Sequence, residues 1–535
     1  MVDLATRARH WALTLTARPS VTGTADEAAF GPWLAQELRQ TFAAAEVWTF
    51  PVAPGDARHC VAMLLRGTGP ATVILTGHYD TVTTADYGDL APLATQPAAL
   101  TPALIARLEH ATTPAEHLAL HDLTSGTFLP GRGLLDMKAG LAAALALSED
   151  FAAQQAPSGN LLFLAVPDEE ASSAGARAAA AALPGIAAQR GLTLVAVLNL
   201  DAIADTGDGS AGRAIALGTV GKVLPMAFVA GVATHSGFPF NGVNAAVLLA
   251  AICARMEWAP ELTDDTAAQP GTPPSLLSMR DGKAGYDVTT PATAFAAWNV
   301  LFHRRPPQDI LLAFEGLCHS ATRDCLTALQ DRAKLQRLPG GDALPAVQVH
   351  RYAAVLQAAR QRGDVDTRVA TLATTLQAAG QSLPDISARV MDLVWHASGL
   401  SGPAVVVGFG SVPYLATHLS TLPAARRLDQ AVRQAAAAAG NVAVTAYFAG
   451  ISDMSFFGEA DEAALAPVAA NSPVWDALIR WPQAGALGGA LAQVPTVNIG
   501  PWGRDYHTPL ERLHVDHAFT LLPRLLRDVV VGVLG

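Results

Sequence analysis

The most informative pattern in the chain is a set of short apolar runs that end in acidic or imidazole side chains. Three such runs are residues 71–77, 161–166 and 194–200. Their length and composition predict buried strands. His78 follows the first run, Asp168, Glu169 and Glu170 follow the second after one proline, and Asp201 follows the third. Because ligands collect at the carboxyl ends of strands in open α/β sheets, the pattern predicts a polar site at that edge.

Amphipathic or alanine-rich segments alternate with these runs and predict helices. The predicted helices are residues 26–45, 141–151, 174–183, 243–256 and 308–317, with a further helix within residues 513–534. Further strands are predicted at residues 294–303, 404–410 and 442–448, and residues 494–501 lead from a strand into a loop. Alternation of strands and helices is typical of the α/β class, which is therefore the predicted fold class.

The chain is too long, at 535 residues, to form one ordinary core, and we predict more than one domain. The pattern of apolar and polar residues changes near residue 218. We therefore assign residues 1–218 to the first part of a main domain and residues 219–330 to an inserted, smaller α+β domain. Residues 331–535 are assigned to the second part of the main domain, with a helical extension at 331–400. Residues 83–130 read as a polar, helical insertion.

Composition narrows the possible partners and the type of metal ligand. With 51% hydrophobic and 15% charged residues the chain is globular, and no run of about 18 apolar residues predicts a membrane span. Residues 1–30 lack the pattern of a secretory signal, so we expect a cytoplasmic protein. A net charge of -11 disfavours nucleic acid and anionic membranes as partners. The four cysteines form no CxxC pair, so any metal must be held by histidines and carboxylates.

Several polar residues at the strand ends are candidates for metal binding or catalysis. His78 and Asp80 fall on one face of an extended segment, which places Asp80 to orient the imidazole. The consecutive carboxylates at 168–170 repel one another, a cost that a bound cation or catalytic chemistry can offset. Taken singly, each residue has an ordinary explanation: Asp136 can cap a helix and His507 can be a core histidine. Their recurrence at strand ends favours a functional site.

A nucleotide-dependent oxidoreductase is a further interpretation of strand–helix alternation. Gly408 and Gly410 follow a predicted strand, as in a dinucleotide-binding loop. Pro413 stands where the third glycine of that fingerprint belongs. The absence of a glycine loop to hold phosphate argues against this interpretation.

The motifs together resemble the zinc metallopeptidase family of aminoacylases, acetylornithine and succinyl-diaminopimelate deacylases, and glutamate carboxypeptidases. The resemblance covers most of the chain and rests on residues 78–82, 131–133, 136–138, 168–170, Asp201, His235, 244–245 and His507. Within that family, residues 86–89 and 450–455 make the chain most similar to the arginine-utilisation, RocB-like branch. The resemblance implies a catalytic domain with a central mixed sheet flanked by helices, and an inserted lid and dimerisation domain at 219–330.

The resemblance also implies a role for each site residue. His78 and Asp201 would bind one zinc ion, Glu170 and His507 a second, and Asp136 would bridge both ions. Asp80 would support His78, and Glu169 would be the general base. His235 would bind the substrate carbonyl or the developing oxyanion, often across a dimer interface in this family. Mixed imidazole and carboxylate ligands suit zinc, and also cobalt or manganese.

The reaction implied by these roles is hydrolysis of an amide bond in a small peptide or N-acyl amino acid. Two bound metals would activate a water, and Glu169 would take its proton and then protonate the leaving amine. An alternative from a different class is a metal-binding or regulatory protein without turnover. The intact set of ligands together with Glu169 argues against that alternative.

One departure from the family bears on the substrate. The family's inserted domain often carries an Asp-x-Arg pair that helps bind a substrate carboxylate. The corresponding region here contains His303, Arg304 and Arg305, and the sequence leaves open whether either arginine binds such a group. The identity of the substrate, the native metal and the oligomeric state also remain open at this point.

Overall fold

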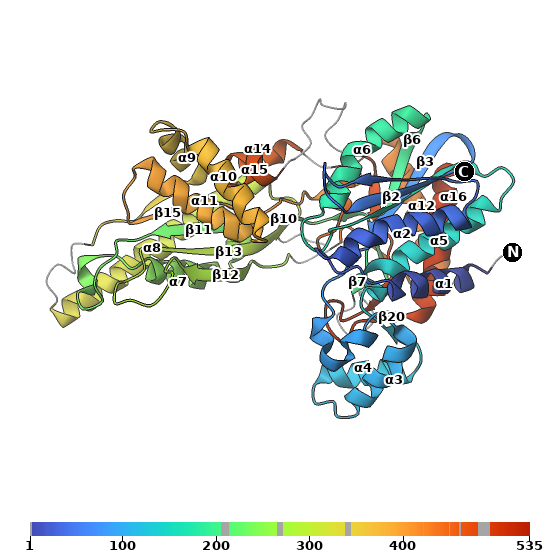
Figure 1. Ribbon diagram of the computed structural model, residues 1–535, viewed down its shortest axis with the longest axis horizontal. Helices are drawn as coiled ribbons and strands as arrows, with labels where there is room; N and C mark the ends of the chain where they lie inside the picture. The colour runs from blue at the N-terminus through green and yellow to red at the C-terminus, as the bar shows by residue number, and fades with distance from the viewer. Residues whose placement is uncertain are drawn as a thin grey trace. The chain divides into compact units, whose positions relative to one another are not determined.

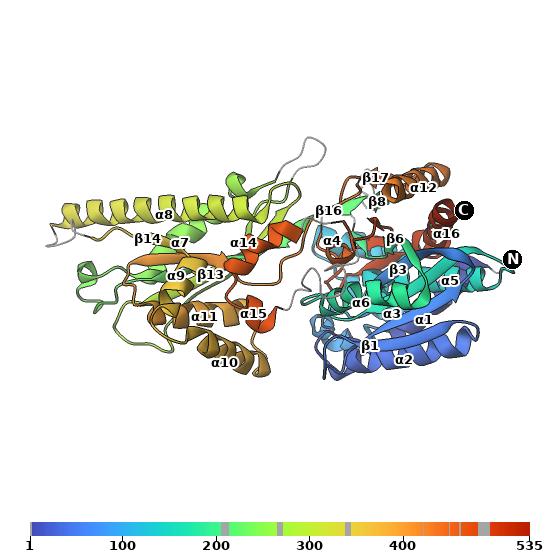
Figure 2. The same cartoon turned by 90° about the horizontal axis from the view of Figure 1, so that it is seen from above.

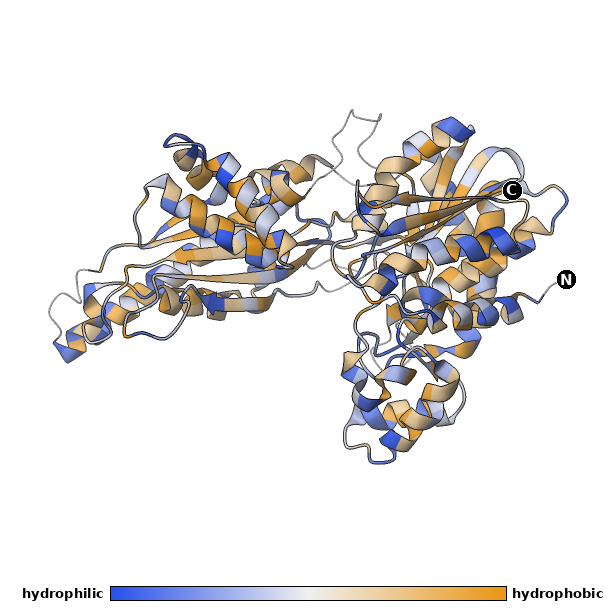
Figure 3. Cartoon of the chain, viewed as in Figure 1, coloured by the Kyte–Doolittle hydropathy of each residue, from blue (hydrophilic) through white to orange (hydrophobic). Residues whose placement is uncertain are grey.

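The computed structural model describes residues 3–204, 213–264, 271–337, 344–420, 422–448, 450–459, 462–479 and 493–535. The chain divides into two compact units, which Figure 1 shows in one view. The first unit comprises Met1–Thr219, Thr417–Ala460 and Pro482–Gly535, and the second comprises Val220–Ala416 and Asp461–Trp481. Each unit has its own hydrophobic core, and Figure 3 shows apolar residues along the strands of both. No helix in the described ranges is long and apolar enough to cross a membrane.

An eight-stranded sheet forms the centre of the first unit, in the order β1-β2-β5-β3-β6-β18-β8-β17. Its strands are β1 Glu46–Pro51, β2 His59–Arg66, β3 Thr68–His78, β5 Ser158–Val166, β6 Thr193–Asn199, β8 Ala214–Ala216, β17 Ala443–Thr445 and β18 Thr496–Asn498. Strand β3 runs parallel to β5 and β6, whereas β2 is antiparallel to both β1 and β5. The predicted α/β fold with a central mixed sheet is therefore confirmed. The parallel strands β3, β5 and β6 end at one edge, as the sequence predicted.

Helices cover this sheet. They are α1 Leu4–Ala17, α2 Ala25–Thr41, α5 Ala139–Ala152, α6 Ala174–Arg190, α12 Pro423–Ala439 and α16 Leu522–Leu534, with a short helix α13 Met454–Phe457. Helix α5 packs against α1 and α16, and α16 packs against α12. The alanine and leucine side chains of α5 are buried from Ala139 to Leu147, because neighbouring elements cover this helix on all sides.

A second, four-stranded sheet lies in the same unit, in the order β4-β20-β19-β7. Its strands are β4 Phe128–Pro130, β7 Ile203–Ala204, β19 Trp502–Arg504 and β20 Arg512–His514. The chain before β4 forms a small helical layer of η1 Ala85–Leu93, α3 Pro97–Leu108 and α4 Pro114–Thr124. Short turns η2 Leu134–Lys138 and η6 His517–Leu521 and a ribbon of β9 Gly218–Thr219 with β16 Thr417–His418 complete the unit.

The second unit is built on a six-stranded sheet, in which β10, β13, β11, β15 and β14 follow one another and β12 pairs with β13. Its strands are β10 Gly221–Val223, β11 Pro225–Ala230, β12 Ser275–Asp281, β13 Thr293–Phe302, β14 Gln348–Arg351 and β15 Ala404–Phe409. Its helices are α7 Ala245–Met256, α8 Pro307–Gln336, α9 Tyr352–Arg360, α10 Val365–Ala378, α11 Leu383–Ser398, α14 Leu465–Ala470 and α15 Trp475–Leu478, with turns η3 Pro239–Asn241, η4 Pro260–Leu262 and η5 Glu462–Ala464. Figure 2 shows α8 on one side of the strands and α10 and α11 on the other.

The extent of this unit differs from the sequence-based division at residue 330. Strand β15 pairs with β11 along its whole length, and β14 pairs in parallel with β15. These pairings make residues 331–400 part of the second unit rather than an extension of the main domain. After α8 the chain returns to the sheet of the second unit with β14 and β15. The hydrophobic pattern of such a return does not differ from that of a new domain, so the sequence did not show where this unit ends.

Candidate metal centre

The strand ends and loops of the first unit bring the predicted metal ligands together. His78 ends β3, Asp201 follows β6 and Glu170 follows β5. Asp136 lies in the turn η2 before α5, and His507 lies in the loop between β19 and β20. Ligand atoms of His78, Asp136 and Asp201 lie within 4.8 Å of one another, and so do those of Asp136, Glu170 and His507. The two groups share Asp136.

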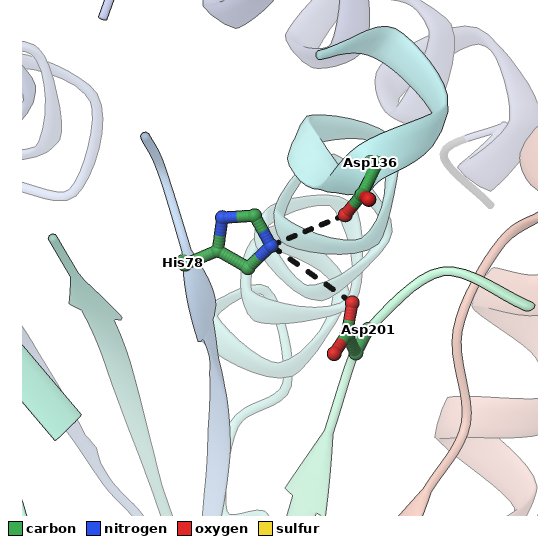
Figure 4. Close-up of side chains that lie close together, drawn as sticks. All are labelled: His78, Asp136 and Asp201. Carbon is green, nitrogen blue, oxygen red and sulfur yellow. Dashed lines mark hydrogen bonds and ion pairs between the residues drawn. The ribbon is translucent and has the colours of Figure 1, made fainter. Parts of the chain in front are cut away.

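The distances place Asp136 between two imidazoles. One carboxylate oxygen, Oδ1, lies 3.2 Å from Nε2 of His78, and the other, Oδ2, lies 3.1 Å from Nε2 of His507. Nε2 of His78 is also 3.9 Å from Oδ1 of Asp201, and Figure 4 shows this imidazole facing both aspartates. Nε2 of His507 is 3.0 Å from Oε1 of Glu170. Each imidazole therefore faces Asp136 and at least one further carboxylate.

Asp80 connects the first histidine with the turn that carries the glutamates. Its Oδ1 lies 3.6 Å from Nδ1 of His78. Its two carboxylate oxygens also accept hydrogen bonds from the backbone N–H groups of Glu169, at 3.1 Å, and of Glu170, at 3.2 Å. The hydroxyl of Thr22 donates a further bond of 2.9 Å. Asp80 is fully buried, so these bonds fix its position and, through it, the position of the turn.

Only two of the three consecutive carboxylates join the cluster. Glu169 and Glu170 form a further group with His78, whose ligand atoms lie within 4.8 Å of one another. Asp168, by contrast, forms an ion pair with Arg58 and accepts hydrogen bonds from the Ser172 hydroxyl and the Ala174 N–H group. The repulsion that the sequence suggested at this turn is thus reduced by one arginine.

The electrostatics of the cluster favour a bound cation. Burial raises the pKa of Glu169 and of Asp201 well above the usual range, and neighbouring carboxylates raise both further. Burial also raises the pKa of Glu170. Burial opposes protonation of His507, but its hydrogen bonds to Asp136 and Glu170 raise its pKa to about 10. The buried carboxylates need positive charge nearby, and imidazole and carboxylate donors at these separations suit divalent metal ions.

Two more buried carboxylates, Glu511 and Asp453, interact with the cluster, and the sequence analysis gave neither of them a role. Glu511 accepts hydrogen bonds from Arg132, at 2.8 Å, and from the Gly133 N–H group, at 3.0 Å. Its pKa is raised to about 8, chiefly by burial. Burial likewise raises the pKa of Asp453 to about 7. Two features of the sequence could have indicated these residues. Asp453 lies in the motif of residues 450–455, and Glu511 lies four residues after His507.

The predicted oxyanion residue, His235, belongs to the second unit. Its side chain is exposed, and the N–H group of Gly237 donates to its Nδ1 at 3.0 Å. In the same unit the backbone N–H groups of His303, Arg304 and Arg305 all donate to one carboxylate oxygen of Asp264. The roles predicted for His235 and for the arginines stay predictions.

Comparison with known proteins identifies the class. The family model described as peptidase family M20/M25/M40 matches residues 112–471, more than half of the chain. The chain belongs to this family, and it is a metal-dependent peptidase or amidohydrolase. The structure of the aminopeptidase PepT from Bacillus cereus covers 99% of each chain with a TM-score of 0.55 and 14% identity, which shows the shared fold.

Two relatives from Bacillus subtilis refine the assignment. The protein YqjN is 28% identical over 478 residues, which cover 88% of this chain and 86% of the relative. The protein RocB is 26% identical over 512 residues, which cover 91% of this chain and 87% of the relative. The predicted RocB-like branch of the family is therefore confirmed.

Proposed function

We propose that the chain is a dinuclear zinc hydrolase that cleaves an amide bond in a small peptide or an N-acyl amino acid. The observation that carries this proposal is the pair of ligand groups that share Asp136, with Glu169 beside them. His78 and Asp201 would hold one ion, Glu170 and His507 the other, and Asp136 both. When bound, two zinc ions would acidify a shared water and polarise the substrate carbonyl. The same donors also accept cobalt or manganese.

The chain's own residues would move the protons. Glu169 lies with its Oε2 4.0 Å from Nε2 of His78, and its side chain is only 13% exposed. Its raised pKa suits a group that takes a proton from water and returns it to the leaving amine. Asp80 would hold Glu169 and His78 in position, because its carboxylate accepts the Glu169 N–H group and its backbone carbonyl oxygen lies 3.0 Å from Nδ1 of His78. His235 would contribute a donor to the developing oxyanion.

The substrate class follows from the relatives' names as a proposal. RocB is similar over most of both chains, and a succinyl-diaminopimelate desuccinylase of Rhodopseudomonas palustris is 31% identical over 206 residues, 37% of this chain and 49% of the relative. The name of the desuccinylase supports an acyl amino acid as the substrate. The resemblance to the arginine-utilisation branch places arginine derivatives among the first compounds to assay.

We further propose that the second unit serves as a lid and a dimerisation domain. Its strand β12 pairs with β13 alone among the described residues, so the other edge of β12 is open. Leu277 and Met279 on this strand are 60% and 45% exposed. An open edge with exposed apolar side chains supports association with a second copy.

Replacement of the proposed base tests the reaction. Glu169→Gln keeps the size of the side chain but removes the proton acceptor, so we expect kcat to fall by about 10²- to 10⁴-fold on a panel of dipeptides and acyl amino acids. Elemental analysis of the same sample should still give two metals per chain. Asp136→Ala should lose metal and activity together, because both ligand groups contain this residue.

Glu46→Gln provides the matched control, because Glu46 is a half-exposed residue of the edge strand β1. It should retain both metal and activity. Near-normal turnover by Glu169→Gln would overturn the assignment of the base. Metal-loaded wild-type protein that turned over nothing in the panel would instead favour a binding protein on this scaffold.

A further inference from the structure

The loop that carries His507 has an uncommon backbone conformation. Residues 505–511 connect β19 to β20, and Asp505 and His507 adopt positive φ angles of 54° and 62°. Residues other than glycine rarely adopt this left-handed conformation, and it persists where surrounding contacts enforce it. The His507 side chain is 41% exposed, so burial alone does not hold it. Contacts elsewhere must fix the loop.

One such contact comes from Arg512, directly after the loop. Its Nη1 atom donates to Oδ2 of Asp505 at 2.6 Å and to the carbonyl oxygen of Leu510 at 3.0 Å. Arg512 thereby bonds to residues near both ends of the loop. Its side chain is fully buried, and a buried guanidinium group is stable only when carboxylates neutralise it.

The carboxylate that completes this arrangement belongs to the helical insertion. Asp122, in the last turn of α4, accepts a hydrogen bond of 2.8 Å from Nε of Arg512. The same oxygen, Oδ2, accepts a bond of 2.7 Å from Nη1 of Arg504, the residue before Asp505. Asp122 therefore binds an arginine on each side of the loop, although it lies 382 residues from Arg504 in the sequence. Its side chain is only 7% exposed.

Apolar packing also holds α4 against the hairpin that β19 and β20 form with the His507 loop. Leu123 and Ala119 of α4 and Leu104 of α3 form a small buried core with Phe128 of β4 and Trp502 of β19. The insertion thus rests on the strand that leads into the loop. This packing fixes the position of the Asp122 carboxylate.

A second carboxylate of the insertion acts at the far end of the loop. Asp86 of η1 accepts a hydrogen bond of 2.5 Å from Nη2 of Arg132. Nη1 of the same arginine donates to Glu511, the last residue of the loop. The guanidinium group of Arg132 also lies 5.2 Å from the centre of the Tyr87 ring. The insertion therefore reaches both ends of the loop through arginines.

From these contacts we infer that the helical insertion of residues 85–124 is the positioning element for His507, and that Asp122 is its principal positioning residue. The ligand group of Asp136, Glu170 and His507 then depends on Asp122, whereas the group of His78, Asp136 and Asp201 does not. This inference rests on the proposed ligation of a metal by His507.

The test is a zinc titration of metal-free protein in competition with a chelator of known affinity, using full-length variants. Asp122→Asn keeps the shape of the side chain but removes the charge that neutralises the two arginines. We expect the zinc affinity of the site that His507→Ala removes to fall about 10- to 100-fold, the range seen when residues that support a metal ligand are replaced. The affinity of the other site should stay within about twofold of the wild type.

Asp89→Asn is the matched control. Asp89 lies in the same insertion and pairs with Arg107, but its side chain is 86% exposed and it has no contact with the loop among the described residues. This variant should bind two zinc ions as the wild type does. If Asp122→Asn fails to fold, as judged by circular dichroism, Arg504→Gln removes one of the two contacts and should give a smaller loss in the same direction.

His507→Ala separates this inference from the proposed function. A loss of one zinc site in His507→Ala, with both sites intact in Asp122→Asn, would overturn the positioning role alone. Two intact sites in His507→Ala would refute the ligand assignment itself. Equal weakening of both sites in Asp122→Asn would also overturn the inference, because it would indicate a general effect on folding.

Discussion

At the scale of single residues, the centre is organised by carboxylates whose own partners are backbone N–H groups and arginines. Asp80 receives the N–H groups of Glu169 and Glu170, and Asp168 is held by Arg58 and the Ala174 N–H group. Hydrogen bonds of this kind stabilise the charged form of a carboxylate and fix its direction. The turn that carries the proposed base is therefore held from both sides before any metal binds.

A buried histidine outside the centre should make stability depend on pH. His517 accepts a hydrogen bond from the Trp502 N–H group at its Nδ1 atom, and burial lowers its pKa to about 3. An unfolded histidine titrates near pH 6.5, so between pH 6.5 and 3 the unfolded state binds a proton that the folded state does not. The free energy of unfolding should therefore fall as the pH is lowered through this range, by about 1.4 kcal/mol per pH unit from this residue.

His517→Gln removes this contribution while it keeps a polar side chain. Urea unfolding of the wild type and the variant between pH 6 and pH 4 measures the difference. The variant should lose stability less steeply with acid than the wild type. Parallel curves would mean that His517 becomes protonated in the folded protein.

At the scale of elements, the sequence predicted the long apolar segments well. Strands expected at 71–77, 161–166 and 194–200 correspond to β3, β5 and β6, and the expected helix at 243–256 corresponds to α7. Continuous apolar runs can form only buried strands or buried helices, and their length distinguishes the two. The helix expected at 308–317 extends to Gln336, because its second half is polar and solvated and carries little apolar periodicity.

The small sheet and its partners could not be predicted. Strands β4, β19 and β20 each have three residues, too few to show alternation. The sequence correctly predicted that the proposed ligands lie close together, because each of them follows a recognisable strand or lies in a recognisable loop. It could not show Asp122 at the His507 loop, because an ion pair between residues far apart in sequence leaves no local pattern.

Two glycines in helices should respond oppositely to the same substitution. A Cβ atom on Gly140 of α5 would lie 2.2 Å from the carbonyl oxygen of Leu200, next to Asp201. Gly140→Ala should therefore lower the free energy of unfolding by about 1–3 kcal/mol through overpacking, even though alanine favours helix. Gly185 of α6 has nothing within 4 Å of such an atom, so Gly185→Ala should raise stability by roughly 0.5–1 kcal/mol.

Thermal unfolding of both variants with and without zinc measures these effects. Gly140→Ala should also weaken zinc binding, because displacement of Leu200 moves the neighbouring Asp201. Gly185→Ala should leave zinc binding unchanged. Equal effects of the two substitutions would contradict the close packing of α5 against the end of β6.

At the scale of the whole molecule, each of the two units has its own hydrophobic core, and the proposed functions are assigned to different units. All the proposed metal ligands lie in the first unit. The second unit contains His235 and the edge of β12 that pairs with no other strand in the described part of the chain. Strands with an open edge pair readily with another chain unless charges or bulges prevent it. The proposed association therefore belongs to the second unit.

Leu277→Lys should convert a dimer into a monomer, because a charged side chain on an edge strand opposes pairing. Leu277 is 60% exposed in the single chain. Val531→Lys is the matched control, since Val531 is 61% exposed on α16 of the first unit. Sedimentation velocity at micromolar concentration measures the outcome. A monomeric wild type, or a dimer unaffected by Leu277→Lys, would contradict association through β12.

The small four-stranded sheet also constrains the order in which the protein can be completed during synthesis. Strands β4 and β7 are made early, but their partners β20 and β19 lie near residues 502–514. In the large sheet, β18 at Thr496–Asn498 likewise joins β6 to β8. A nascent chain that ends before these residues holds His78, Asp136 and Asp201 but has open strand edges beside them. Residues 496–514 are made after the other strands of both sheets, so they close both sheets and deliver the fifth ligand late in synthesis.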